Sequence, residues 1–157
     1  MKTILPVTAA AVAACSALGS LASREVNSSW YAALDKPSFQ PPGAVFGLAW
    51  TVLYGDIAVT SAVALDRLRR EDPAAAVAYA RALAVNLLLN AGWSWVFFVF
   101  HRLGAAVAVA SALALSSADL VRRTASADRR AGVALGPYPL WCAFATALSA
   151  AIWRRNR

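Results

Sequence analysis

The chain has 157 residues, of which 60% are hydrophobic and only 15% are charged. An average soluble domain has about a quarter of its residues charged, so this composition excludes an ordinary soluble fold and favours a protein whose surface faces lipid. The net charge of +7 does not indicate nucleic-acid binding, because the arginines occur in short clusters between apolar runs. We therefore expect the lipid bilayer, and not nucleic acid, as the partner of this surface.

The first apolar run covers residues 3–22, and two interpretations of it are open. Lys2 and the segment Val12–Cys15 would suit a signal peptide with a lipoprotein cleavage box. However, the run is long enough to cross a hydrocarbon core of about 30 Å, whereas the apolar part of a signal peptide is roughly 7–15 residues. We predict a retained transmembrane helix.

Residues 23–43 form the one long polar segment between apolar runs. Pro37, Pro41 and Pro42 fix the backbone and oppose a regular helix through it. Trp30 and Tyr31 are of the types that prefer the membrane–water boundary. We predict a stiff loop that caps one end of the helices.

The rest of the chain contains four more apolar runs, each long enough to cross a membrane. They cover residues 44–65, 74–100, 103–121 and 131–153. A charged turn over 66–72 separates the first two of them, and Asp72 followed by Pro73 is typical of a helix start. The fold class predicted is an all-α membrane protein, a single domain (residues 1–157) that forms a five-transmembrane-helix bundle.

Alanines recur every fourth residue in three of the apolar runs, at Ala76, Ala80 and Ala84, at Ala106, Ala110, Ala114 and Ala118, and at Ala143, Ala147 and Ala151. Small residues at this spacing let transmembrane helices approach closely. The stripes either pack within one bundle or form the seam of a homodimer.

Aromatic and amide side chains form stripes on three of the predicted helices. The stripes are Phe46, Trp50 and Tyr54; Asn86, Asn90, Trp93 and Phe97; and Trp141 with Phe144 and Ala145. Spacings of three and four place each stripe on one helix face. Two interpretations are open: the stripes fill the bundle core, or they surround a flat apolar ligand with a few polar groups.

The sequence offers no recognised catalytic constellation. Its one histidine, His101, falls in a predicted loop, and no carboxylate pair, metal-ligand cluster or phosphate-binding loop is present. Two acids lie within predicted spans, and each should face protein or water. We expect Asp119 to pair with Arg122 or Arg123, whereas Asp56 has no evident partner.

Motifs along the whole chain match, in order, those of one known family. They are Trp30-Tyr31 with Lys36-Pro37 and Pro41-Pro42, Phe46, Trp50 with Tyr54, Asn90 with Trp93 and Phe97-Phe98, Pro137-Tyr138 with Trp141 and Phe144, and Trp153-Arg154 with Asn156. The chain resembles the TspO/MBR family, which comprises the bacterial tryptophan-rich sensory proteins and the translocator protein, also called the peripheral benzodiazepine receptor.

The resemblance implies five transmembrane helices around a pocket closed by the first loop, homodimers in several members, and binding of tetrapyrroles such as protoporphyrin IX. Porphyrin would be a ligand, and no cofactor is expected. Carried over by position, the ligand-contacting candidates are Tyr31, Trp50, Tyr54, Asn86, Asn90, Trp93, Trp141, Phe144 and Ala145. The resemblance also places the chain in a bacterial cell membrane. Trp95 stands where many members have proline, which predicts a straighter third helix.

Three functional hypotheses follow. The leading one is a sensor or carrier in which three tryptophans stack on a porphyrin and the two asparagines bond its polar periphery. The second is an enzyme that degrades porphyrin in light, as has been proposed for bacterial members. The third is a structural or regulatory membrane protein in which the aromatic stripes only pack.

Overall fold

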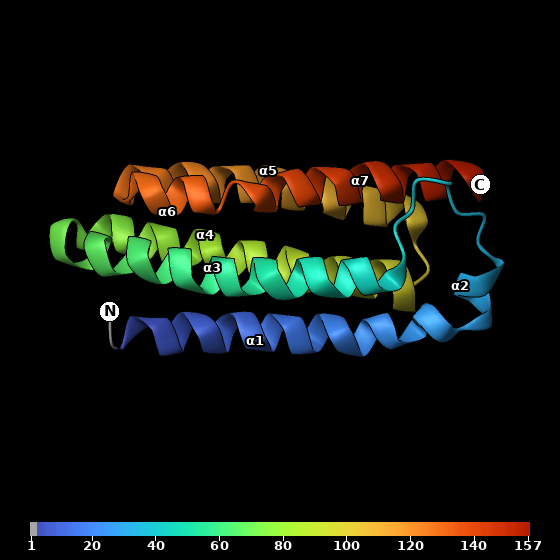
Figure 1. Ribbon diagram of the computed structural model, residues 1–157, viewed down its shortest axis with the longest axis horizontal. Coiled ribbons are helices and arrows are strands. Elements are labelled where there is room, and N and C mark those ends of the chain that lie inside the picture. Colours follow the sequence, from blue (N-terminus) through green and yellow to red (C-terminus); the bar gives the residue numbers. More distant parts are fainter. Residues whose placement is uncertain (1–2) are drawn as a thin grey trace.

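The computed structural model describes residues 3–157, and this part of the chain is helical, without strands. Five long helical segments lie side by side, and each runs antiparallel to the one before it in the chain (Figure 1). They are α1 (Ile4–Ser23), α3 (Gly43–Glu71), α4 (Pro73–Ser94) continued by a π-helical turn η2 (Trp95–Val99), α5 (Leu103–Ala127), and α6 (Arg129–Ala134) followed by α7 (Pro137–Arg155). Each segment is long and apolar enough to cross a membrane. The all-α, five-helix prediction is confirmed.

The second long helix continues through most of the charged segment that we expected to form a turn. α3 extends to Glu71, and Asp72 alone separates it from α4. Arg70 pairs with Asp66 one turn earlier, and both basic residues of the last turn lie where the helix dipole favours positive charge. The predicted start of the next helix is confirmed, since the Asp72 side chain accepts a hydrogen bond from the Ala75 amide.

The fourth long helix also extends beyond its predicted end, by more than a turn. α5 continues from residue 121 to Ala127 because Asp119 pairs with arginines three and four positions later. The distances are 2.6 Å to Arg122 and 2.5 Å to Arg123. The expected ion pairing of Asp119 is thus confirmed, and it stabilises the segment that sequence polarity had suggested was a loop.

The fifth apolar run is divided into a short helix and a long one. Asp128 starts α6 by accepting a hydrogen bond from the Ala131 amide and forms an ion pair of 2.7 Å with Arg67 of α3. The hydrogen bond from the Ala131 amide is the main cause of a lowered pKa of the Asp128 carboxyl, and the charge of Arg67 lowers this pKa further. α6 packs so closely on α5 that a Cβ at Gly132 would lie 2.4 Å from that of Ala125.

The end of the third long helix is not regular α-helix, a feature that the missing proline did not predict. Residues Trp95–Val99 form a π-helical turn instead. The wider turn lets two consecutive side chains, Phe97 and Phe98, both be buried, with exposures of 2% and 9%. The Trp95 indole donates to the Leu18 carbonyl of α1 and so anchors the turn. A π-helical turn often marks a functional site in a helix.

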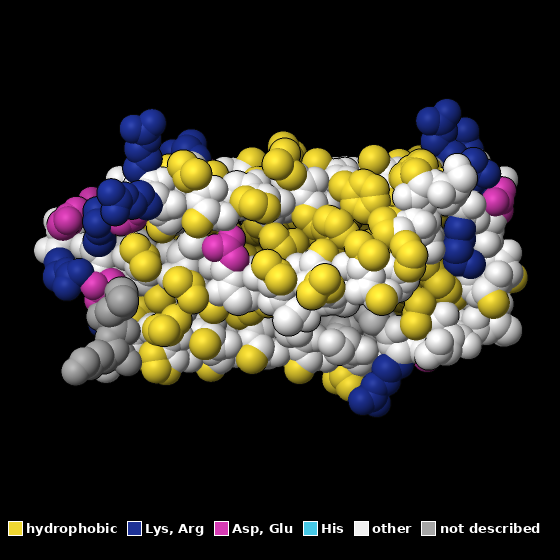
Figure 2. All heavy atoms as spheres, in the orientation of Figure 1, with side chains coloured by type: hydrophobic (Ala, Val, Ile, Leu, Met, Phe, Trp, Pro, Cys, Tyr) yellow, Lys and Arg dark blue, Asp and Glu magenta, His cyan; other side chains and the backbone are white. Residues whose placement is uncertain are grey.

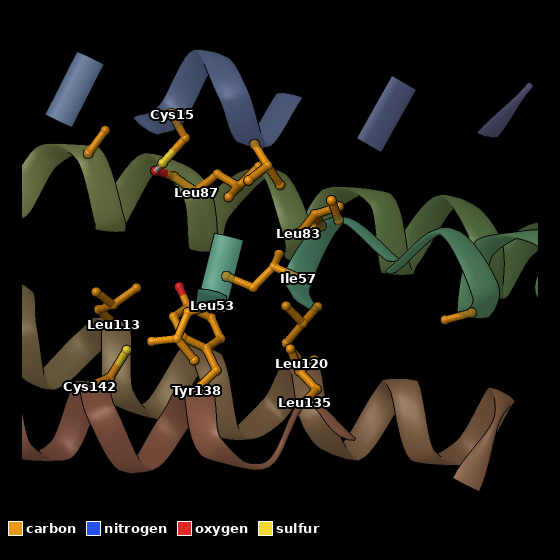
Figure 3. Packing of buried hydrophobic residues seen from close by; sticks show 14 of the residues in the cluster. Cys15, Leu53, Ile57, Leu83, Leu87, Leu113, Leu120, Leu135, Tyr138 and Cys142 are labelled. Atoms are coloured by element: carbon orange, nitrogen blue, oxygen red, sulfur yellow. Dashed lines mark hydrogen bonds between the residues drawn. The ribbon is translucent and has the colours of Figure 1, made fainter. Parts of the chain in front are cut away.

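The core lies along the middle of the bundle, where all five long segments meet (Figure 3). Cys15 of α1 points toward Leu87 of α4, and Tyr138 of α7 lies beside Leu53 of α3. In Figure 1, α1 forms one layer, α3 and α4 the next, and α5 with α6 and α7 the third. The chain ends lie at opposite ends of the bundle, as an odd number of crossings requires.

The segment between α1 and α3 contains more helix than its prolines suggested. It begins with a 3-10 turn η1 (Arg24–Asn27) and a short helix α2 (Ser29–Ala33). Ser28 starts α2 by accepting a hydrogen bond from the Tyr31 amide. Residues 34–42, which contain the three prolines, then cross the end of the bundle without regular structure (Figure 1). We call residues 28–42 the lid.

Candidate functional site

A cavity of about 620 Å³ lies below the lid, near the end of the bundle that carries α2. Side chains from α1, the lid, α3, α4 with η2, α5 and α7 all contribute to its walls. Figure 2 shows a hollow with hydrophobic side chains between α3 and α7 on the same half of the molecule. Its size is within the range of about 300–1,000 Å³ typical of small-molecule sites.

Aromatic rings form the wall between α3 and α7. The rings of Trp50 and Tyr54 stack with centroids 5.4 Å apart, as their one-turn separation on α3 allows. Trp141 of α7 meets Trp50 edge to face at 6.5 Å and Phe46 at 5.7 Å. Side chains of this size hold the two backbones apart, and the flat ring faces provide surfaces for a flat partner.

A second aromatic group closes the cavity from the side of η2 and the lid. Trp93 stacks on Phe97 with centroids 5.4 Å apart and meets Phe98 edge to face at 5.9 Å. Tyr31 of the lid contacts Phe98 at 5.6 Å. The π-helical turn therefore presents two phenyl rings to the cavity and the lid at once.

The floor of the cavity is a chain of hydrogen bonds between four helices, α3, α4, α5 and α7. Tyr54 donates to the amide oxygen of Asn90 at 2.9 Å, and the Asn90 amide nitrogen donates to the Tyr138 hydroxyl at 3.1 Å. Tyr138 donates in turn to Asn86 at 2.7 Å, whose amide nitrogen donates to Ser117 at 3.1 Å. Because each hydrogen bond in this chain holds a side chain that also takes part in the next one, the network fixes the orientation of Tyr54 and Asn90 at the cavity surface.

Contacts at both ends hold the lid over the cavity. Asn156, just after α7, exchanges two hydrogen bonds of 2.9 Å with the backbone of Asp35. The Gln40 amide donates to the Tyr31 hydroxyl at 3.1 Å, which ties the two arms of the lid together. The Lys36 ammonium lies 4.5 Å from the centre of the Tyr31 ring and donates to the Tyr31 carbonyl at 2.5 Å.

The cavity surface carries no charged side chain among the described residues that line it. Two of the lining residues, Trp93 and Gln40, each have one buried hydrogen-bonding atom without a partner in the described chain, Nε1 and Oε1 respectively. Nε1 of Trp141, behind the cavity wall, is likewise buried and unpaired. A buried donor without an acceptor costs about 1–3 kcal/mol. The site is therefore suited to an uncharged face of a ligand that carries both an acceptor and a donor.

Comparisons with known proteins agree with this arrangement. The model of the TspO/MBR family matches residues 7–154. The chain belongs to the TspO/MBR family. It is 36% identical over 145 residues to the tryptophan-rich sensory protein of Cereibacter sphaeroides, covering 92% of this chain and 88% of that protein. It is 33% identical over 143 residues to protein CrtK of Rhodobacter capsulatus, covering 91% and 88%, and 33% identical over 134 residues to the translocator protein of Homo sapiens, covering 81% and 75%.

Membership of the TspO/MBR family, together with five spanning helices, makes this chain a multi-pass integral membrane protein. Bacterial proteins are among its relatives, which agrees with the predicted location in a bacterial cell membrane. The localisation prediction is confirmed.

Six of the nine ligand-contact candidates of this TspO/MBR protein line the cavity. They are Tyr31, Trp50, Tyr54, Asn90, Trp93 and Ala145. Trp141 and Phe144 pack directly behind this surface, with ring centroids 5.3 Å apart. Contact with a ligand stays a prediction for all eight.

Asn86 is not among the residues that line the cavity, and its contact with a ligand stays a prediction. Its side chain is fully buried, and both ends of its amide are bonded, to Tyr138 and to Ser117. Asn86 lies one turn earlier on α4 than Asn90, beyond the cavity floor. The structure gives it a positioning role, because it orients the Tyr138 hydroxyl that holds Asn90.

The sequence did not reveal the contribution of α1 to the cavity. Ser16, Gly19, Ser20 and Ser23 of α1 line the cavity. Their spacing of three, one and three places them on one helix face, so the periodicity was present in the sequence. Small residues within an apolar run give little contrast, and no aromatic side chain drew attention to this face.

Asp56 stays unusual in the structure. It lies in the middle of α3, is half-buried, and its carboxylate has no hydrogen bond or ion pair with any residue described. It is not among the residues that line the cavity. A carboxylate at this depth is costly in a membrane.

Proposed function

We propose that this protein is a membrane-embedded binding protein, a sensor or carrier, for tetrapyrroles such as protoporphyrin IX and similar flat hydrophobic molecules. The observation that carries the proposal is the cavity of about 620 Å³, which is walled by stacked aromatic rings and lined by no charged residue. Filling the core alone would not leave such a space, because protein interiors are close-packed.

The polarity of the walls favours one orientation of a tetrapyrrole. A carboxylate buried among these walls would have no cation to pair with, so the acidic edge of the ligand belongs near the lid and water. The apolar edge then lies against Trp50 and Ala145, deeper in the bundle. Trp93 and Gln40 line the cavity and each has one unpaired polar atom, so a small rotation of either side chain would present a donor or an acceptor to the macrocycle.

The test is a titration of the detergent-solubilised protein with protoporphyrin IX, followed by tryptophan fluorescence. Trp50→Phe and Trp93→Phe reduce the stacking area of two residues that line the cavity and remove their indole donors, so the half-saturation concentration should rise about 2- to 10-fold. Trp95→Phe is the matched control, because that indole donates to α1 and does not line the cavity. Unchanged half-saturation in both cavity variants would show that the pocket assignment is wrong.

A purely structural role makes a different prediction for the same preparation. A ligand that binds only the native state raises the unfolding temperature as its concentration increases. If neither protoporphyrin IX nor any other flat hydrophobic compound raises it, the aromatic stripes only pack and the protein is no small-molecule receptor.

A further inference from the structure

A second, shallower pocket of about 410 Å³ lies outside the cavity, between the start of α5 and the end of α7. It shares no residue with the cavity. Its lining residues are His101, Arg102, Leu103, Gly104, Ala105, Trp153, Asn156 and Arg157. Since α5 begins at Leu103 and α7 ends at Arg155, the pocket lies where two spans leave the hydrocarbon, at the depth of lipid headgroups.

The pocket is positively charged, and no aspartate or glutamate is among the residues that line it. Arg102 and Arg157 are exposed, and neither forms an ion pair with any described residue. The acid nearest in structure to this end of α7, Asp35, is already paired with Arg155. Arginine recognises phosphate through paired hydrogen bonds, so two unpaired guanidinium groups beside one hollow suit a phosphate better than any other common membrane group.

The walls of the pocket complement the rest of a lipid headgroup region. The Trp153 indole lies against the first turn of α5, where a Cβ at Gly104 would come within 3.2 Å of the ring. The Arg157 guanidinium lies 5.5 Å from the Trp153 ring. Indoles prefer the membrane interface, so the pocket combines an interfacial aromatic wall with two cations. No side chain caps the first turn of α5, whose amide groups add a weak positive field.

We propose that this pocket binds the phosphate of an anionic phospholipid such as phosphatidylglycerol. Two of its residues also hold the lid: the His101 ring stacks on Trp30 at 3.8 Å, and Asn156 bonds Asp35. A bound headgroup would touch both anchors and stabilise the closed lid. The proposal concerns a lipid site and does not depend on what the central cavity binds.

The experiment is native mass spectrometry of the protein in dodecylmaltoside micelles, titrated with dioleoylphosphatidylglycerol. The double variant Arg102→Gln with Arg157→Gln should weaken the tightest lipid adduct about 30-fold, from two interfacial arginine contacts. The control double variant Arg129→Gln with Arg130→Gln removes the same charge from exposed residues at the other end of the bundle, and should bind as the wild type does.

Three results would overturn the proposal. The first is equal loss of affinity in the two double variants, which would show only a general charge effect. The second is equal binding of the zwitterionic dioleoylphosphatidylcholine, which would show that the phosphate is not recognised by charge. The third is displacement of the lipid by inorganic phosphate at millimolar concentration, which would assign the pocket to a free anion.

Discussion

Replacing Tyr138 by phenylalanine should cost stability and ligand affinity together. The substitution removes one hydroxyl from a fully buried side chain and leaves the ring in place. It breaks two hydrogen bonds, to Asn86 at 2.7 Å and from Asn90 at 3.1 Å. Hydrogen bonds between membrane helices contribute about 0.6 kcal/mol on average and about 1.7 kcal/mol at most, so two of them predict a loss of about 1–3 kcal/mol.

Tyr79→Phe is the matched control for this prediction. Tyr79 is 1% exposed and its hydroxyl also has two partners, Ser61 at 3.2 Å and Thr124 at 2.8 Å. Neither of these partners lines the cavity, whereas Asn90, a partner of Tyr138, does. The free energy of unfolding is measured by titrating dodecylmaltoside micelles with sodium dodecyl sulfate and following helicity by circular dichroism. Both variants should lose similar stability, whereas only Tyr138→Phe should weaken protoporphyrin IX binding, because it frees Asn90 to rotate. Unchanged stability, or equal effects of the two variants on binding, would refute this reasoning.

Three further predictions concern stability, measured as the unfolding temperature in detergent. Gly132→Ala should destabilise the protein by about 1–3 kcal/mol, because the added Cβ would overlap Ala125. Gly55→Ala is the control and should be neutral or stabilising, because its added Cβ meets nothing within 4 Å. Equal effects of the two variants would contradict the close packing of α6 on α5. The Asp128 carboxyl has a lowered pKa in the folded protein, so its contribution to the stability of the fold should be complete above its ordinary pKa of about 3.9 and should be lost as the pH falls through the lower folded value. Asp128→Ala should abolish this part of the dependence of the unfolding temperature on pH. An unaltered pH profile in the variant would contradict the prediction. Asp56→Leu removes an unpaired carboxylate and should stabilise by about 1 kcal/mol or more; a loss would reveal a partner for Asp56.

The sequence predicted the five long helices because apolar runs of spanning length leave few alternatives. It misplaced the ends of α3 and α5, where polar residues support helix through ion pairs at one-turn spacing, as Asp119 does. Polarity alone cannot separate a loop from an exposed helical turn. The π-helical turn at Trp95 depends on packing against α1, which local sequence does not encode.

The candidate site was predictable in outline for a similar reason. Helical spacing assigns residues to a face, and so it brought Trp50, Asn90 and Trp93 to one space. Spacing does not tell at what depth a cavity ends, which is why Asn86 was expected beside the ligand and lies in the network below it. The hydrogen bond between Asn156 and the Asp35 amide of the lid joins residues far apart in the chain, and no local sequence pattern could have indicated it.

The most direct test of ligand binding in the central cavity is to fill that cavity. Ala145 lines it, whereas Ala143, two residues earlier on α7, is exposed on the outside of the bundle. An absorbance titration with protoporphyrin IX should show affinity reduced about tenfold or more in Ala145→Phe, since overpacking costs about 1–3 kcal/mol, and wild-type affinity in Ala143→Phe. Wild-type affinity in Ala145→Phe would contradict the assignment of this cavity as the porphyrin site.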